Sequence, residues 1–256
     1  MTQKNNHWST DRYVKKGINR QERGMKDTYL TNYVNLVKKY VKPKSKILDI
    51  GCGAGLSSKM LSETYEVTGV DHSRPFIEYA KSRFKNITFK YEDARKLSFK
   101  DGSFDASMAC GFIEHIEEID AVLDEMVRVV RKNGFMILVS PSWFSPFRAI
   151  RGLIRPKGYE TMGRNRLQII GWLAKSVYYT VQKQINPKYI FRSPDIESEE
   201  LVGNDIDMVY IANQYDLKNA FEKRKCKVLN LNADTFKFSS IPFLCTWLGV
   251  VAVKLP

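Results

Sequence analysis

The chain has 256 residues, and 43% of them are hydrophobic, so it can bury a full core as one elaborated domain. Its four cysteines show no C-x-x-C pairing and its three histidines are scattered, which argues against a zinc site or a disulfide framework. The polar start of the chain, residues 1–12, predicts no signal peptide, and the longest apolar run, residues 241–253, is too short to span a bilayer. We therefore expect a cytoplasmic protein with no metal site.

The formal net charge is +13, and it is distributed unevenly along the chain. Residues 1–46 and 142–192 each carry a net charge of +9, whereas residues 47–141 carry −3 and residues 193–256 carry −2. The middle of the chain is therefore slightly acidic, and two other segments carry the positive excess.

Residues 1–45 are predicted to form helices that precede the first strand. Apolar residues at helical spacing predict a helix that packs on a sheet: Leu30, Tyr33, Val34, Val37 and Val41. The more N-terminal part, Trp8–Lys26, has two interpretations: a lid that closes over a ligand, or a helix that covers a sheet edge.

The glycine-rich stretch from Gly51 to Gly55 follows a short apolar strand, Ile47–Ile50, and precedes a helix that starts near Leu56. Three glycines in five residues let the backbone turn sharply and let a ligand lie against the main chain. The N–H groups that begin the helix face the same space. The G-x-G-x-G spacing differs from the G-x-G-x-x-G of dinucleotide sites and from the phosphate loop, which argues against a pyrophosphate or triphosphate ligand.

Acidic residues accompany the first three predicted strands. Asp49 lies in the first, Asp71 ends the second (residues 66–71), and Asp93 follows the third (residues 87–91). Asp71 lies 22 residues after Asp49, where an acid can accept hydrogen bonds from a ribose diol. Because ligands of open parallel sheets bind outside the carboxyl ends of the strands, three converging acids fit a ligand with ribose, amine groups and positive charge.

Six short motifs occur in a fixed order along the chain. They are Leu48–Gly55, Gly69–Ser73, Glu92–Ala94, Ser103–Asp105, Glu114–Ile116 and Arg128–Phe135. With these motifs, residues 44–140 resemble the core of class I S-adenosylmethionine-dependent methyltransferases, in the type 11-like branch that modifies small molecules. The two ends of the chain match that family only loosely.

The resemblance implies S-adenosyl-L-methionine as the cofactor and gives individual residues a role toward it. Asp49 would support the glycine loop and the amino group of the cofactor. Gly51 and Gly53 would let its methionine part pass, and Asp71 would hold the ribose hydroxyls.

The same resemblance implies the residues around the adenine. His72 would lie beside the ring, and Asp93 would accept a hydrogen bond from the adenine amine, with the N–H of Ala94 nearby. Cys110, at the end of the fourth strand, would offer a backbone contact.

The resemblance also implies an α/β fold, with a doubly wound, Rossmann-like sheet of seven mostly parallel strands, the last of them antiparallel. Residues 46–140 would be the cofactor-binding core and residues 216–256 the C-terminal helix and strands of a single domain. The remaining elements are predicted as strands at Ser103–Cys110, Gly134–Ser140, Cys226–Leu231 and Trp247–Lys254 and as a helix at Asp216–Lys225. Gly134 is predicted to end the helix before the fifth strand.

Residues 141–215 are a long insertion after the fifth strand, where we predict a substrate-binding cap. The first half is basic and aromatic, and its helical spacing predicts an amphipathic helix, with apolar residues Leu167, Ile170, Leu173, Val177, Val181 and Ile185. The second half is acidic, with Asp195, Glu197, Glu199, Glu200, Asp205 and Asp207.

Four interpretations of the insertion stay open. Its apolar stripe packs on the core, with the charges solvated or paired. Its basic amphipathic surface rests on anionic lipid. It grips an anionic substrate such as a phosphorylated or lipid-linked sugar. It binds nucleic acid, which is disfavoured because no recognised RNA-binding module stands at either end of the chain.

The chemistry follows from the implied cofactor. Its sulfonium already makes the methyl group electrophilic, so the enzyme chiefly holds a nucleophile in line and excludes water. A hydroxyl acceptor also needs a base, and the candidate is His115, beside Glu114 after the fourth strand. The alternative is that Glu114 and His115 only cap and pack the next helix.

The sequence therefore predicts a methyltransferase that acts on a small molecule, with an anionic or lipid-linked acceptor and oxygen as the first choice of acceptor atom. The rivals are an RNA methyltransferase and a non-catalytic binding or scaffold protein that retains the fold. An Asn-Pro-Pro-Tyr type of signature is absent, because residues 109–112 read Ala-Cys-Gly-Phe. The sequence makes no prediction of the oligomeric state.

Overall fold

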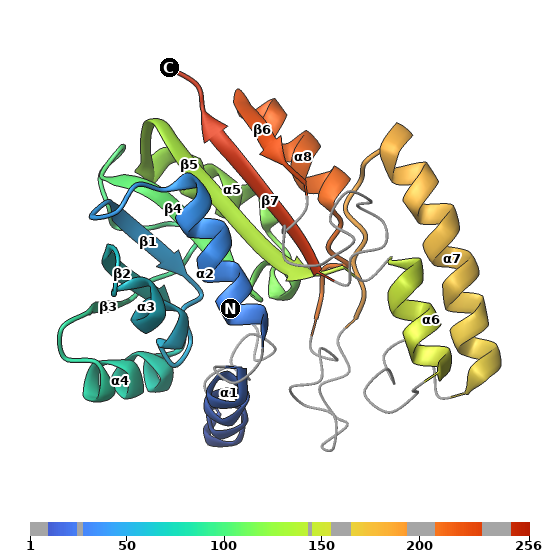
Figure 1. The fold of residues 1–256 in the computed structure, drawn as a ribbon, viewed down its shortest axis with the longest axis horizontal. Helices are drawn as coiled ribbons and strands as arrows, with labels where there is room; N and C mark the ends of the chain where they lie inside the picture. The colour runs from blue at the N-terminus through green and yellow to red at the C-terminus, as the bar shows by residue number, and fades with distance from the viewer. Residues whose placement is uncertain (1–9, 25–27, 143–144, 155–164, 194–207, 232–246) are drawn as a thin grey trace.

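A seven-stranded sheet forms the centre of the protein in the computed structural model (Figure 1). The structure describes residues 10–24, 28–142, 145–154, 165–193, 208–231 and 247–256. The strands are β1 (Lys46–Ile50), β2 (Glu66–Asp71), β3 (Thr88–Tyr91), β4 (Phe104–Cys110), β5 (Val130–Pro141), β6 (Cys226–Asn230) and β7 (Trp247–Lys254).

The strand order is β3-β2-β1-β4-β5-β7-β6. β1 to β5 pair in parallel, whereas β7 lies antiparallel between β5 and β6. The predicted Rossmann-like sheet with an antiparallel last strand is therefore confirmed. Its order places the carboxyl ends of β1 to β5 at one edge, which is where the predicted acids lie.

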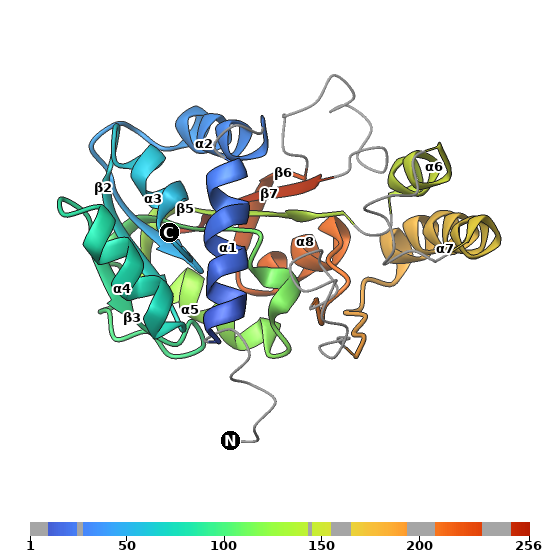
Figure 2. The same ribbon diagram turned by 90° about the horizontal axis from the view of Figure 1, so that it is seen from below.

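Helices cover both faces of the sheet, as Figure 2 shows for α2 on one side and α5 on the other. They are α1 (Asp11–Gly24), α2 (Thr28–Tyr40), α3 (Leu56–Leu61), α4 (Arg74–Arg83), α5 (Ile119–Val129), α6 (Pro146–Ile154), α7 (Arg166–Ile185) and α8 (Gln214–Lys223), with a 3-10 helix η2 (Ile113–His115). Because side chains alternate along a strand, Leu48 and Ile50 of β1 join the core with α5 and α8, and Ile47 joins the core with α2.

Gly134 does not end a helix, contrary to the prediction. α5 already ends at Val129, and β5 begins at the next residue, Val130. Gly134 lies inside the strand, where a Cβ atom would come within 2.5 Å of the carbonyl oxygen of Asp105 on β4. Glycine is therefore required for close approach of two strands at an irregular part of the β4–β5 ladder.

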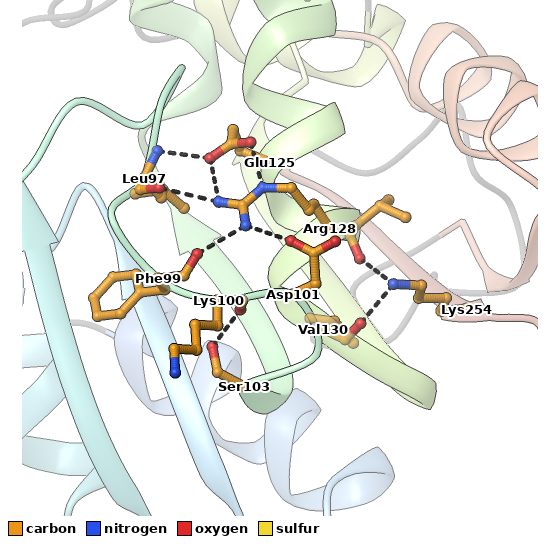
Figure 3. A network of polar contacts seen from close by, with 10 residues as sticks. Leu97, Phe99, Lys100, Asp101, Ser103, Glu125, Arg128, Val130 and Lys254 are labelled. Carbon is orange, nitrogen blue, oxygen red and sulfur yellow. Dashed lines mark hydrogen bonds and ion pairs between the residues drawn. The ribbon is translucent and has the colours of Figure 1, made fainter.

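A charged clamp joins the end of α5 to the loop between β3 and β4 and to the end of β7, remote from the carboxyl ends of the parallel strands (Figure 3). The guanidinium of Arg128 donates to the carbonyl oxygens of Leu97 and Phe99 at 3.0 and 2.7 Å and forms an ion pair with Glu125 at 2.7 Å. Nearby, Nζ of Lys254 donates to the carbonyl oxygens of Val127 and Val130 at the α5–β5 junction. This clamp fixes the helix that supports the site without taking part in it.

The helices of the insertion, α6 and α7, lie side by side at one end of the molecule (Figures 1 and 2). They follow Pro141, the last residue of β5, and precede α8, which begins at Gln214. The acidic half of the insertion, residues 195–207, lies outside the described residues. Among the helices that the structure describes, none has both the length and the apolar character to cross a bilayer.

The apolar stripe predicted on α7 does not pack on the core. Only Leu173 is partly buried, and the others are exposed: Leu167, Ile170, Val177, Val181 and Ile185. The reason is that α7 turns a different face inward. That face carries Ile169 in an apolar cluster and Lys183 in a buried ion pair with Asp216 of α8.

Candidate cofactor site and active site

The glycine loop turns sharply at the end of β1 and is tied to β2. The N–H groups of Gly51 and Cys52 both donate to the carbonyl oxygen of Val70, at 2.8 and 3.0 Å. The three loop glycines all have positive φ, with +69° at Gly51. A Cβ atom at Gly51 would lie 2.3 Å from the ring of Phe112, so the side chain that follows β4 lies directly over the loop.

Asp49 is buried beneath this loop, with 1% of its surface exposed. Its Oδ2 atom accepts hydrogen bonds from the hydroxyls of Ser57 and Ser58 at 2.7 and 2.6 Å, and the hydroxyl of Tyr33 lies 3.5 Å from Oδ1. Burial raises the pKa of Asp49 to about 6, although these hydrogen bonds oppose the shift. The carboxylate thus fastens β1 to α3 and is a costly buried charge that a cationic ligand would stabilise.

Asp71 is held by two main-chain N–H groups. Gly53 donates to its Oδ2 atom at 2.9 Å, and Ser73 donates to its Oδ1 atom at 2.8 Å. Burial raises the pKa of Asp71, and these two hydrogen bonds act against the rise. Because a carboxylate has about four acceptor positions, the oriented group keeps acceptor capacity for two neighbouring hydroxyls. The structure therefore fits the ribose-binding role implied for this residue.

Asp93 is bound by a neighbour that the sequence analysis did not single out. The guanidinium of Arg95 contacts both of its oxygens, with a shortest distance of 2.6 Å, and holds the pKa of Asp93 below its usual range. Arg95 also pairs with Glu118 at 2.8 Å, just before α5. Any contact of Asp93 with an adenine amine would have to share the carboxylate with this arginine. Ala94, the next residue, packs against the core beside α5.

An exposed aromatic stack stands at the ends of β2 and β3. The rings of His72 and Tyr91 are stacked with centroids 5.1 Å apart, and the guanidinium of Arg74 lies 4.3 Å from the centre of the Tyr91 ring. His72 also lies close enough to Asp71 and Asp93 to favour their charged forms. His72 was expected beside the adenine, whereas Tyr91 was not expected there; its only signal in the sequence is an aromatic residue at the end of a predicted strand.

The end of β4 brings two carboxylates near one thiol. Burial raises the pKa of Cys110 well above its usual range, and the nearby carboxylates of Glu114 and Asp49 raise it further. Glu114 is buried, and its Oε2 atom accepts a hydrogen bond from the hydroxyl of Ser140 on β5 at 3.0 Å. Cys110 is therefore not a reactive thiolate, and its expected contribution is through the backbone.

His115 ends the short helix η2, beside Glu114. Its N–H donates to the carbonyl oxygen of Phe112 at 3.0 Å, so the histidine and the ring over the glycine loop belong to one turn. The carbonyl oxygen of Glu114 accepts hydrogen bonds from Val209 and Tyr210, which join this turn to the end of the insertion. The candidate base thus lies between the glycine loop and the segment that returns from α7.

The N-terminal helix α1 covers the glycine loop. Val14 of α1, Ala54 of the loop and Phe76 of α4 are all buried in one apolar cluster. Two interpretations of this segment were a lid over a ligand and a helix that covers a sheet edge. In the structure α1 packs against the glycine loop and α4. The loop, the carboxylates of Asp49 and Asp71 and the aromatic stack together fit an elongated ligand with a cationic part and a ribose.

The comparisons with known proteins agree with this geometry. Residues 48–138 match the family described as "Methyltransferase domain". Over these residues the chain is thus similar to a methyltransferase domain. The fold and family of this methyltransferase core imply S-adenosyl-L-methionine as its cofactor.

Several curated methyltransferases are similar to this core. The chain is 32% identical over 37% of its length to "Phosphatidylethanolamine N-methyltransferase" of Cereibacter sphaeroides, covering 50% of that protein. It is 33% identical over 43% of its length to "Demethylmenaquinone methyltransferase" of Beutenbergia cavernae, covering 48%. It is 35% identical over 37% of its length to "Ubiquinone biosynthesis O-methyltransferase" of Pelagibacter ubique, covering 41%. The chain thus spans about half the length of the curated relatives that it matches, or less.

Solved structures share the fold over most of the chain. A methyltransferase from Mesorhizobium loti superposes with a TM-score of 0.55 at 15% identity, covering 83% of this chain and 92% of that one. One from Methanosarcina mazei gives a TM-score of 0.54 at 20% identity, covering 86% and 96%. At these identities the likeness concerns the fold alone.

Proposed function

We propose that the protein transfers a methyl group from S-adenosyl-L-methionine to a small lipid-type acceptor. The observation that carries the proposal is the arrangement at the carboxyl edge of the sheet. There, Gly53 of the glycine loop donates to Asp71, and Asp49 is held by Ser57 of α3 close enough to Asp71 for the two carboxylates to interact. A protein that only retained the fold would have no use for a buried carboxylate whose charge costs stability.

The proposed contacts follow from the orientation of each group. Asp71 holds the ribose hydroxyls with the acceptor positions that Gly53 and Ser73 leave open. Asp49 supports the loop and favours the cationic amino group. Gly53 leaves room for the methionine part, since the ring of Phe112 fills the space beside Gly51. His72, Asp93 and Ala94 bind the adenine end, beside the stack of His72 and Tyr91, and Cys110 offers a backbone contact at the end of β4.

When bound, the cofactor supplies an electrophilic methyl group on a sulfonium. The residues of the protein hold the acceptor in line and exclude water, which is where most of the acceleration of such a transfer arises. For a hydroxyl acceptor, we assign the base to His115, at the end of η2. This residue would accept the hydroxyl proton of the acceptor.

The names of the relatives support the acceptor class. Two of them are named for a phospholipid and a quinone, and a third is named as an O-methyltransferase of ubiquinone biosynthesis. We therefore propose a lipid-type acceptor that is methylated on oxygen. The insertion between β5 and α8, which includes α6 and α7, is the proposed substrate cap.

Titration calorimetry with S-adenosylmethionine and S-adenosylhomocysteine tests the cofactor. We expect binding by the wild type and a loss of at least tenfold in affinity for Asp71→Ala, whereas Asp124→Ala, which removes an exposed carboxylate on α5, binds as the wild type does. A wild type that binds neither compound contradicts the proposal.

Transfer of a labelled methyl group into cell extracts tests the acceptor. We expect label in the organic-solvent phase, in a product whose mass and NMR spectrum show a methoxy group. His115→Gln should lower kcat more than KM. Label that appears only in RNA contradicts the proposed lipid-type acceptor but not the proposed cofactor.

A further inference from the structure

α7 presents an apolar face to solvent over its whole length. The exposed side chains on this face are Leu167, Ile170, Val177, Tyr178, Val181 and Ile185. Apart from the neighbours Val177 and Tyr178, successive members are three, four or seven residues apart, so all of them lie on one side of the helix. Leu167 and Ile185, at its two ends, are 80% and 82% exposed.

This exposure is concentrated in one place on the molecule. Within the described residues, twelve large apolar side chains are exposed, and eight of them belong to α6 and α7. Ile150 and Ile154 of α6 supply the other two, one helical turn apart. Soluble surfaces normally carry such side chains singly, so a contiguous stripe indicates a surface that becomes covered.

The orientation of the stripe is fixed by the opposite face of α7. Nζ of Lys183 forms a buried ion pair with Asp216 of α8 at 2.5 Å. Ser176 and Thr180 are buried on the same side, and Ile169 packs with Ala149 of α6. Because these contacts hold the inner face, α7 cannot turn its outer stripe into the core without breaking a buried ion pair.

The charge around the stripe is positive. Between residues 142 and 192 there are ten lysines and arginines but a single acid, Glu160. Arg166 is exposed one turn before Ile170, and Lys175 is exposed one turn before Tyr178, so the two cations border the stripe. Within the described part of the chain, neither side chain forms an ion pair. An apolar stripe bordered by cations complements a surface whose interior is apolar and whose outer layer carries negative charge.

We propose that α7, with α6 beside it, lies on the surface of an anionic membrane. The apolar stripe enters the boundary between headgroups and acyl chains, and Arg166 and Lys175 face the lipid phosphates. The exposed Tyr178 suits the same boundary, because its ring is apolar and its hydroxyl is polar. A second copy of the chain fits less well, since a two-fold contact through this face would bring its basic borders together.

Membrane binding itself does not depend on methyl transfer. If this contact also lets the protein take its lipid-type acceptor from the membrane, that part rests on the proposed function. The two are separable by experiment, because cofactor binding can be measured by calorimetry on the same protein that is tested for membrane binding. Loss of one with retention of the other shows which inference fails.

Vesicle flotation tests the contact with the intact protein. We expect it to float with vesicles of phosphatidylcholine and phosphatidylglycerol and to stay unbound with phosphatidylcholine alone. The bound fraction on the anionic vesicles should fall at least tenfold when the salt concentration rises. Failure to float with the anionic vesicles, or equal binding to both compositions, overturns the proposal.

Two pairs of variants locate the contact on α7. Val177→Asp with Val181→Asp should lower anionic-vesicle binding at least tenfold, whereas Leu229→Asp with Leu255→Asp, at exposed apolar positions elsewhere, should bind as the wild type does. Arg166→Gln with Lys175→Gln should weaken binding and flatten its salt dependence. Lys85→Gln with Lys100→Gln, at exposed cations elsewhere, is the matched control.

Folding of each variant is checked by its thermal unfolding and its affinity for S-adenosylmethionine. Unchanged vesicle binding by a folded α7 variant overturns the proposal. The proposal is also overturned if light scattering shows that the wild type is a dimer and that the α7 variants are monomers. The apolar face would then bind a second copy of the chain.

Discussion

The main-chain N–H of Gly53 donates a hydrogen bond to Oδ2 of Asp71, with a nitrogen–oxygen distance of 2.9 Å. Gly53 belongs to the loop after β1, and Asp71 ends β2. This one hydrogen bond therefore holds the glycine loop next to the carboxylate. The other oxygen of Asp71 accepts from Ser73 at 2.8 Å. The carboxylate is therefore both a support of the loop and a proposed ligand contact.

Asp71→Asn is expected to damage both roles. An amide has one acceptor oxygen, so Gly53 and Ser73 can no longer both donate to the side chain, and its NH2 group faces one of their N–H groups. We expect at least a tenfold loss of affinity for S-adenosylmethionine, about 1.4 kcal/mol, in titration calorimetry. Asp124→Asn on the surface of α5 serves as the control. Wild-type affinity in the Asp71→Asn protein would show that the carboxylate charge is not used.

Asp49→Asn is expected to stabilise the ligand-free protein at neutral pH. Since burial raises the pKa of Asp49 to about 6 from its usual 3.8, the folded protein holds this proton more tightly than the unfolded chain does. The resulting stabilisation is complete below pH about 4 and is lost as the pH rises to about 6. Relative to the wild type, the free energy of unfolding of the variant should therefore rise by about 3 kcal/mol between pH about 3 and pH about 7.

Urea unfolding at a series of pH values measures this difference. The same variant should bind S-adenosylmethionine more weakly, because the buried charge is present for the ligand rather than for the fold. A difference in unfolding free energy that is constant from pH 4 to pH 7 would mean that Asp49 is not the titrating group.

Gly51→Ala is expected to destabilise the loop for two separate reasons. The new methyl group would lie 2.3 Å from Phe112, and alanine is strained at a φ of +69°. We expect a loss of about 2 kcal/mol or more in the free energy of unfolding, together with loss of cofactor binding. Adding Phe112→Ala should remove the clash but leave the backbone strain, so stability should return only in part.

Gly171→Ala is the matched glycine control. Gly171 lies in α7, no atom lies within 4 Å of the position that its new methyl group would take, and its φ is not positive. Because alanine favours a helix over glycine, this variant should gain roughly 0.5–1 kcal/mol. Equal destabilisation by both substitutions would contradict the special geometry assigned to Gly51.

Lys183→Met is expected to loosen α7 from the core. Lys183 and Asp216 are almost completely buried and 2.5 Å apart, so removing the cation leaves an unpaired carboxylate inside the protein. We expect a loss of about 3–5 kcal/mol in unfolding free energy, of which Asp216→Leu in the same chain restores a large part. Lys218→Met breaks the exposed pair with Glu222 and should cost less than about 1 kcal/mol.

The elements with strong local patterns were predicted well. β1 and β2 follow the predicted ranges, and β7 spans Trp247–Lys254 as predicted. The acids Asp49, Asp71 and Asp93 could be placed at one edge because the order of a parallel sheet follows from its connections. Tyr33 could not be predicted as the partner of Asp49, because it reaches that carboxylate through tertiary packing. Arg95 lies only two residues after Asp93, and its pairing depends on a local turn of the loop that was not predicted from the sequence.

The methyltransferase fold, the glycine loop and the positions of the acids could all be read from the order of the residues, because they depend on local backbone geometry and on strand order. Which face of α7 is buried could be learned only from the packed molecule. The spacing of its apolar residues predicted an amphipathic helix but left open whether the stripe packs on the core. The buried Lys183–Asp216 pair and the Ile169 cluster turn the other face inward. The orientation of an amphipathic helix depends on the surface that the rest of the chain provides for packing. In this protein the packing leaves the apolar stripe of α7 exposed, and we propose that a membrane covers it.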